Sequence, residues 1–100
     1  MIFRIWKGWA SKENASDYET LFRDVVLPKV TAGIDGYKGV NLLRREVNDE
    51  IEFTTIFRFD TLDAIKSFAG PDFERAVVPS EVKALLSRFE IVVQHHEVIF

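Results

Sequence analysis

The only two histidines of the chain stand side by side near its C-terminal end, in the stretch VVQHHEVIF. Imidazole exchanges protons near neutral pH, so His95 and His96 are candidates for a catalytic base. Successive side chains of a strand point to opposite faces, so a regular strand lets only one of them face a pocket. We favour His96, because its face carries Gln94 and apolar residues, whereas Glu97 beside His95 suggests a charge-paired structural role.

A metal site is not predicted. Zinc requires three or four converging ligands, and this chain offers two diverging histidines, no cysteine and scattered carboxylates. His95 and Glu97, two residues apart on one face, would form a partial site only. The ordinary alternative for either histidine is a buried or interfacial imidazole that a neighbouring carboxylate satisfies.

Further polar and aromatic side chains could furnish a pocket. Arg45 is expected to pair with Glu52 across a hairpin, which leaves Arg44, on the apolar face, as a third candidate catalytic residue. The candidate substrate-binding residues are aromatic or carry a polar tip: Trp6, Trp9, Tyr18, Asn41, Phe53, Phe57 and Phe73. Core packing explains the same aromatic residues, so no single one of them defines a site.

Composition limits the partners. One hundred residues with 47% hydrophobic content predict one domain over residues 1–100. The net charge of -3, with no basic cluster beyond Arg44-Arg45, argues against nucleic acid and anionic membranes. No apolar run could span a bilayer, and Arg4 and Lys7 interrupt the stretch where a signal peptide would be apolar. With the lack of cysteine, this predicts a cytoplasmic protein.

The elements that must position these side chains follow from periodicity and turn residues. The pattern predicts strands over residues 1–9, 37–47, 50–59 and 90–100. It predicts a helix that starts near Ser11 and ends or kinks near Pro28, a second from Asp60 to Phe68, and a short helical turn from Ser80 that extends toward Phe89. Residues 33–36 read as a loop.

The pair Asn48-Asp49 suits a two-residue hairpin turn between the second and third strands. That turn would place Val47 opposite Glu50, Arg45 opposite Glu52 and Arg44 opposite Phe53. The hairpin would then have an apolar face for the core and a mixed face.

The order strand, helix, strand, strand, helix, strand predicts an α+β fold of the ferredoxin-like, split βαβ type, with a four-stranded antiparallel sheet and helices on one face. The first and last strands are apolar on both faces, whereas a sheet with one covered face alternates apolar and polar residues. We therefore expect a second copy of the chain to cover the other face in a homodimer.

Nearly the whole chain resembles the antibiotic biosynthesis monooxygenase-like (ABM) domain family. The resemblance rests on the stretches RIWKGW, GYKGVNLLRRE, EFTTIFRFDTLDAIKSFAG and DFERAVVPSEVKALLSRFE. It implies a dimeric α/β barrel built from two ferredoxin-like subunits. The family includes cofactor-independent oxygenases of polyketide-type phenols, quinol oxygenases, haem-degrading enzymes and members without known activity.

The resemblance implies a monooxygenase that uses no metal, haem or flavin and acts on a small aromatic, quinol-like or polyketide-like molecule. Such a substrate is first deprotonated to an electron-rich anion, which then passes an electron to dioxygen. This chemistry requires a dry pocket, and a base or hydrogen-bond donors that stabilise the anion. The haem-degrading pattern fits less well, because residues 1–9 contain no asparagine and residues 61–89 no histidine. The alternatives are a non-catalytic small-molecule-binding or stress-related dimer and a purely structural dimerisation domain.

Overall fold

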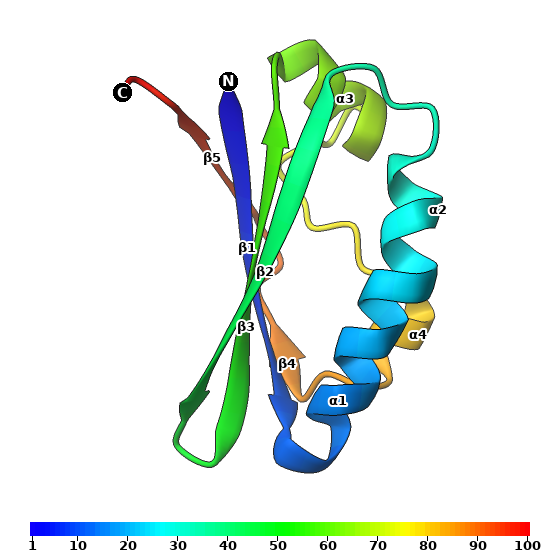
Figure 1. Ribbon diagram of the computed structural model, residues 1–100, viewed down its shortest axis with the longest axis vertical. Coiled ribbons are helices and arrows are strands. Elements are labelled where there is room, and N and C mark those ends of the chain that lie inside the picture. Colours follow the sequence, from blue (N-terminus) through cyan, green and yellow to red (C-terminus); the bar gives the residue numbers. More distant parts are fainter.

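All 100 residues are described by a computed structural model, in which helices pack on one face of an antiparallel sheet (Figure 1). The strands run in the order β2-β3-β1-β4, and β5 also pairs with β1. Their bounds are β1 Ile2–Ser11, β2 Tyr37–Val47, β3 Glu50–Phe59, β4 Arg88–Phe89 and β5 Gln94–Glu97. The α+β class and the split βαβ order are confirmed, and the sheet of one chain does not close into a barrel.

The hairpin of β2 and β3 has the predicted register. Arg45 lies opposite Glu52, and Arg44 lies opposite Phe53. Asn48 and Asp49 both adopt positive φ angles, 50° and 65°. A two-residue turn of this kind matches the twist of the strands it joins, and Asn and Asp tolerate the left-handed conformation.

The last strand is not the continuous strand over residues 90–100 that the pattern predicts. Gly8 pairs with Phe89, but Ile5 pairs with Gln94, so three steps along β1 correspond to five along the final segment. Residues 91–93 leave β1 and pair with residues 74–76, where an isolated bridge joins Arg75 to Val92. The backbone groups of this excursion are satisfied by a loop, which strand propensity alone cannot foresee.

The first helical segment does not end at Pro28. It comprises α1 (Lys12–Leu21), a π-helical turn η1 (Phe22–Val26) and α2 (Leu27–Thr31) without a break. The Leu27 N–H donates to the Phe22 carbonyl, five residues back. Proline lacks an N–H and its ring crowds the preceding turn, and a widened turn just before it lets the helix continue.

Two shorter helices complete the covered face. The helix α3 (Leu62–Ala69) is capped by the Thr61 hydroxyl, which accepts from the Ala64 N–H at 3.2 Å, and ends at Gly70. The helix α4 (Ser80–Lys83) is a single turn. It stops well short of the predicted extent, since Phe89 belongs to β4.

The core lies between the sheet and the helices. It consists of twelve buried residues: Ala10, Ala15, Tyr18, Phe22, Val26, Ile51, Phe53, Phe57, Phe59, Ala64, Ile65 and Val82. No helix covers the opposite side of the sheet, which we call the open face (Figure 1). No helix of the chain is long and apolar enough to cross a membrane.

Candidate active site

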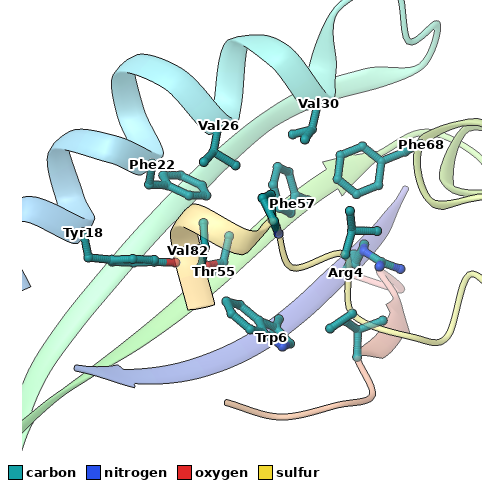
Figure 2. A pocket seen from close by; sticks show the side chains of 14 residues that line it. Arg4, Trp6, Tyr18, Phe22, Val26, Val30, Thr55, Phe57, Phe68 and Val82 are labelled. Carbon is teal, nitrogen blue, oxygen red and sulfur yellow. The ribbon is translucent and has the colours of Figure 1, made fainter. Parts of the chain in front are cut away.

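A cavity of about 50 Å³ lies between the first helical segment, the sheet and residues 76–82 (Figure 2). We call it the helix-side pocket. Eleven of its fourteen lining residues are hydrophobic. The complete lining consists of Arg4, Trp6, Tyr18, Phe22, Val26, Val30, Thr55, Phe57, Phe68, Ala76, Val77, Pro79, Val82 and Val93. The pocket is thus an apolar space with few polar groups, the usual character of a small-molecule site.

Strand alternation places the sheet side of the lining. Arg4 and Trp6 of β1 and Thr55 and Phe57 of β3 all lie on the helix-covered face, two residues apart in each strand. The Trp6 indole Nε1 donates to the Glu90 carbonyl at 2.6 Å, which fixes the ring against the pocket wall. The strands therefore hold the lining side chains on a rigid support.

Arg4 is buried, with only 3% of its surface exposed. Its guanidinium donates to the backbone carbonyls of Phe73 and Arg75, the latter at 3.0 Å, and its Nη1 lies 2.9 Å from the His95 Nε2. Arginine only donates, so His95 accepts at Nε2 and carries its proton at Nδ1. Burial lowers the pKa of Arg4 to about 10, and no carboxylate forms an ion pair with it.

His95, not His96, lies on the helix-covered face. His95 pairs with Arg4 in the register of β5 and β1, whereas His96 pairs with Phe3, faces the other way and is exposed. The preference for His96 as the pocket-facing imidazole is therefore wrong. His95 itself lies behind Arg4, and burial, with the charge of Arg4, lowers the pKa of its imidazole. It is a neutral acceptor at pH 7.

Two hydroxyl groups reach the pocket from opposite walls. Tyr18 of α1 is 1% exposed, and burial raises the pKa of its phenol to about 12. Its hydroxyl points toward Thr55 of β3 (Figure 2). The Thr55 Oγ1 is buried, and no group lies in the geometry of a hydrogen bond to it. A polar ligand atom would satisfy it.

The other expected aromatic residues divide between pocket and packing. Trp6, Tyr18 and Phe57 line the helix-side pocket. Phe53 is fully buried against Tyr18, with ring centroids 4.7 Å apart, and belongs to the core. The Phe73 ring lies 5.6 Å from the ring of His95, outside the lining.

Three further candidates lie away from the pocket. Arg44 pairs with Glu19 at the exposed rim, and its guanidinium lies 5.9 Å above the ring of Phe53. Asn41 accepts from Arg58. Trp9 faces away from the pocket and stacks under the Arg88 guanidinium at 4.0 Å. The structure thus gives Arg44, Asn41 and Trp9 partners in packing and ion pairing.

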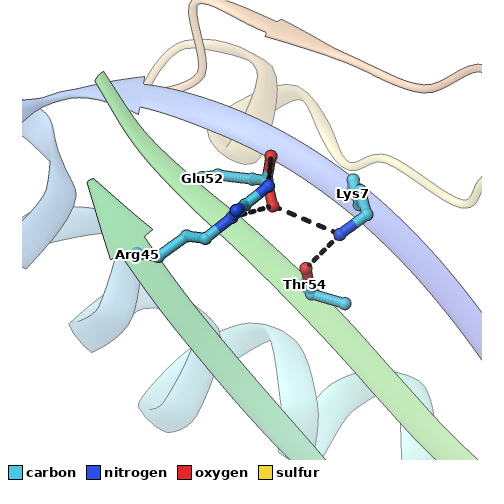
Figure 3. A network of polar contacts seen from close by, with 4 residues as sticks. All are labelled: Lys7, Arg45, Glu52 and Thr54. Atoms are coloured by element: carbon cyan, nitrogen blue, oxygen red, sulfur yellow. Dashed lines mark hydrogen bonds and ion pairs between the residues drawn. The ribbon is translucent and has the colours of Figure 1, made fainter. Parts of the chain in front are cut away.

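The expected partnership of Arg45 with Glu52 is confirmed, and Lys7 extends it (Figure 3). Arg45 Nε and Lys7 Nζ lie 3.0 and 3.2 Å from the Glu52 carboxylate, and Lys7 also donates to the Thr54 hydroxyl at 2.7 Å. Hydrogen bonds from Arg45 and Lys7 lower the pKa of Glu52 to about 2. This network stabilises the open face and stands apart from the pocket.

The residues present do not fit a metal ion or a haem. No group of three histidine, cysteine, aspartate or glutamate side chains could hold a metal. No histidine lines the pocket, and the Nε2 of His95 already accepts from Arg4. A volume of about 50 Å³ is also far below that of a macrocycle. A cofactor-free protein remains a prediction.

Sequence reasoning missed Arg4 and Thr55 as pocket residues. A signal for Arg4 was present, since it shares a strand face with Ile2 and Trp6 and is the only charge on that face of an otherwise apolar segment. Thr55 offered no comparable signal, because threonine is common on any strand.

No protein-family model matches the sequence, and no curated protein matches it. The structure is similar to Rv0793 from Mycobacterium tuberculosis, with a TM-score of 0.65 and 17% identity over 99% of this chain and 95% of that one. It is also similar to an MhuD variant solved with two manganese protoporphyrin IX molecules per active site, with a TM-score of 0.68 and 16% identity over 100% and 96% of the two chains.

A third similar structure is a proposed antibiotic biosynthesis monooxygenase from Bacillus cereus, with a TM-score of 0.58 and 16% identity over 99% and 96% of the two chains. This chain has the ABM-type fold. The ferredoxin-like fold that the sequence resemblance implies for one subunit is therefore confirmed. At these identities the likeness establishes the fold, and the activity has to be argued from the pocket.

Proposed function

We propose that this ABM-fold chain is a cofactor-independent monooxygenase that acts on a small aromatic, quinol-like molecule. The observation that carries the proposal is the helix-side pocket, an aromatic-walled space with a few buried polar groups. The similarity to MhuD and to a proposed antibiotic biosynthesis monooxygenase supports a monooxygenase-type function in coarse terms. We further propose that the protein acts as a homodimer in the cytoplasm.

The proposed chemistry starts with an electron-rich aromatic anion that passes an electron to dioxygen. Apolar walls formed by Trp6, Phe57 and Phe68 exclude water from this anion, and the Tyr18 and Thr55 hydroxyls can orient it. Of the two histidines, His95 is the one on the helix-covered face, behind Arg4, and is therefore the candidate base. Its Nε2 becomes available for a proton only when Arg4 releases it.

The size of the pocket limits the substrate. A space of about 50 Å³ holds a few water molecules, so an aromatic ring enters only when the wall moves. Residues 76–79 form part of that wall and have no regular secondary structure. A single-ring quinol requires a smaller movement than a polycyclic polyketide, and we therefore favour the single ring.

The test measures oxygen consumption by the purified protein with a panel of hydroquinones and anthrones. We expect turnover with a single-ring hydroquinone and loss of turnover in Ala76→Trp, which fills the pocket from its wall. Ala32→Trp adds the same ring at an exposed position outside the lining and should retain turnover. No oxygen uptake with any member of the panel would contradict the proposal.

The second candidate is a non-catalytic small-molecule-binding protein. It is favoured by the engagement of the His95 Nε2 with Arg4, which leaves no free base in the pocket. Panel members that raise the melting temperature of the parent, but not of Ala76→Trp, without any oxygen uptake would support this alternative. A chain that dimerises but shows neither oxygen uptake nor stabilisation by any member of the panel would be a structural dimerisation domain.

A further inference from the structure

Arg4 is the only basic residue that is buried in this chain, and it lines the helix-side pocket. A buried charge is costly unless an opposite charge or several hydrogen bonds compensate it. The buried carboxylate of Glu52 provides a comparison, since Lys7 and Arg45 neutralise it. Arg4 has hydrogen-bond acceptors but no carboxylate partner, so no ion pair neutralises its positive charge beside this apolar space.

The neighbours of Arg4 hold it in place without neutralising it. Its Nη1 donates to the Phe73 carbonyl and to His95, and its Nη2 donates to the Arg75 carbonyl. These acceptors are neutral. A guanidinium has five N–H groups, so the Nε–H and one N–H of Nη2 form no hydrogen bond within the chain. Two free donors on neighbouring nitrogens match the two oxygens of a carboxylate.

We propose that Arg4 binds the carboxylate of a single-ring aromatic acid whose ring occupies the helix-side pocket. The apolar lining suits the ring, and the buried guanidinium at one end of the lining suits the anion (Figure 2). Because the Phe73 and Arg75 carbonyls already hold the guanidinium, little order is lost on binding. The inference deepens the proposed function by naming the charge of the ligand, and it rests on that function only for the aromatic ring.

The experiment compares acids with their neutral amides, benzoate with benzamide and 4-hydroxybenzoate with 4-hydroxybenzamide, on the full chain. Titration calorimetry gives each affinity, and the NMR signal of the Arg4 Nε–H reports on the guanidinium. We expect each acid to bind at least about tenfold more tightly than its amide, the scale of a charge-assisted pair. We also expect the Arg4 Nε–H signal to shift on saturation with the acid.

Variants separate Arg4 from the general charge of the protein. In Arg4→Gln the acid and the amide should bind with about equal affinity, because the affinity for the acid falls while that for the amide is retained. The matched control is Arg23→Gln, which removes an exposed arginine paired with Asp24 and should keep the preference. A preference that persists in Arg4→Gln would overturn the inference.

If Arg4→Gln does not fold, the parent protein decides. Equal affinity for acid and amide, an Arg4 Nε–H signal that does not move, or no binding of either acid at millimolar concentration would each overturn the inference. Oxygen uptake is a separate measurement. Turnover of a neutral hydroquinone without a preference for acids would refute this inference and leave the proposed function standing. A preference for acids without turnover would support this inference and refute the proposed monooxygenase activity.

Discussion

At the residue scale, His95 gives a pH-dependent prediction. Burial, then the charges of Arg4 and His96, lower the pKa of its imidazole, while Glu74 opposes the shift. The unfolded chain therefore binds a proton at a higher pH than the folded chain, so His95 destabilises the fold as the pH falls below its ordinary pKa of about 6.5. The free energy of unfolding of His95→Gln should decline less than that of the parent between about pH 7.5 and about pH 5.5.

The measurement is urea unfolding at several pH values across this range. His96→Gln is the matched control, because His96 is exposed and faces the opposite side of the sheet. Its stability should follow the pH dependence of the parent closely, because the charge of His96 is the smallest of the contributions at His95. Identical pH profiles for His95→Gln and the parent would show that His95 is not shielded from solvent by Arg4.

The sequence allowed the correct statement that the two histidines point to opposite faces, but not which one points inward. The choice relied on the polar neighbours Gln94 and Glu97. A better guide was Val93, which shares a face with His95 and lines the pocket. Arg4 is hard to recognise from sequence for a related reason, since a charge between apolar residues of a strand argues against a signal peptide and does not by itself indicate a buried group.

At the scale of elements, two glycines of the loop before β2 form a matched pair. Both have positive φ, 70° at Gly33 and 87° at Gly36. A Cβ at Gly33 would meet nothing within 4 Å, whereas at Gly36 it would collide with the Asp60 carboxylate and lie 2.8 Å from the Ala64 Cβ. Gly33→Ala should cost about 1 kcal/mol for the left-handed backbone alone, and Gly36→Ala about 2 to 4 kcal/mol with the overlap added.

Chemical denaturation of the parent and the two variants measures this difference. The slope against denaturant should stay unchanged, so that the midpoints report stability. Equal destabilisation by the two alanines would mean that the loop shifts to make room at Gly36, and the close approach of this loop to α3 would then be unimportant for the fold.

The pairing of β2 with β3 across the open face gives a second prediction at this scale. Hydrogen bonds from Arg45 and Lys7 lower the pKa of Glu52 to about 2. Its stabilising effect is present above the unfolded pKa of 4.5 and is lost as the pH falls toward the folded value. Glu52→Gln should cost about 1 to 2 kcal/mol at pH 7, because both cationic partners are partly exposed.

The difference between Glu52→Gln and the parent should shrink between about pH 5 and about pH 3, where the Glu52 carboxylate of the unfolded chain takes up a proton and that of the folded chain does not. Glu46→Gln is the control, since Glu46 is 61% exposed and pairs with Lys12 alone. It should change the stability by less than about 0.5 kcal/mol. A constant difference for Glu52→Gln down to pH 3 would contradict the assignment of the low pKa to the ion-pair network.

The hairpin and the final segment show which elements a sequence of this kind predicts. In the hairpin, the turn residues Asn48 and Asp49 and the pair Arg45–Glu52 lie close together in the sequence, so local chemistry determines the register. The final segment instead divides its backbone pairing between β1 and residues 74–76. That division depends on where a distant loop lies, and no local pattern encodes it.

At the scale of the whole molecule, the fold could be predicted because the order of elements and the one-sided core leave few alternatives. The pocket could be predicted only in part. Trp6, Tyr18 and Phe57 do line it, but its size and its polar groups depend on how residues 76–82 close over the sheet. Periodicity carries no information about such an irregular segment.

The open face leads to the last prediction, a homodimer. Helices cover only one side of the sheet (Figure 1). The apolar residues Phe3, Ile5 and Trp9 of β1 lie on the other side. Leu43 of β2 lies on that side, opposite Thr54, and is 49% exposed. Light scattering at micromolar concentration should give about twice the chain mass of 11.6 kDa. A folded monomer at that concentration would contradict the prediction.

A pair of variants tests whether the open face is the contact surface. Leu43→Asp places a charge where two copies would meet and should raise the dimer dissociation constant at least about tenfold, because an unpaired charge is costly to bury. Val25 is equally exposed, at 49%, but lies on the helical layer. Val25→Asp should therefore leave the dimer intact. If Val25→Asp dissociates the dimer and Leu43→Asp does not, the two copies meet through their helices, and the sheet of each remains open to solvent.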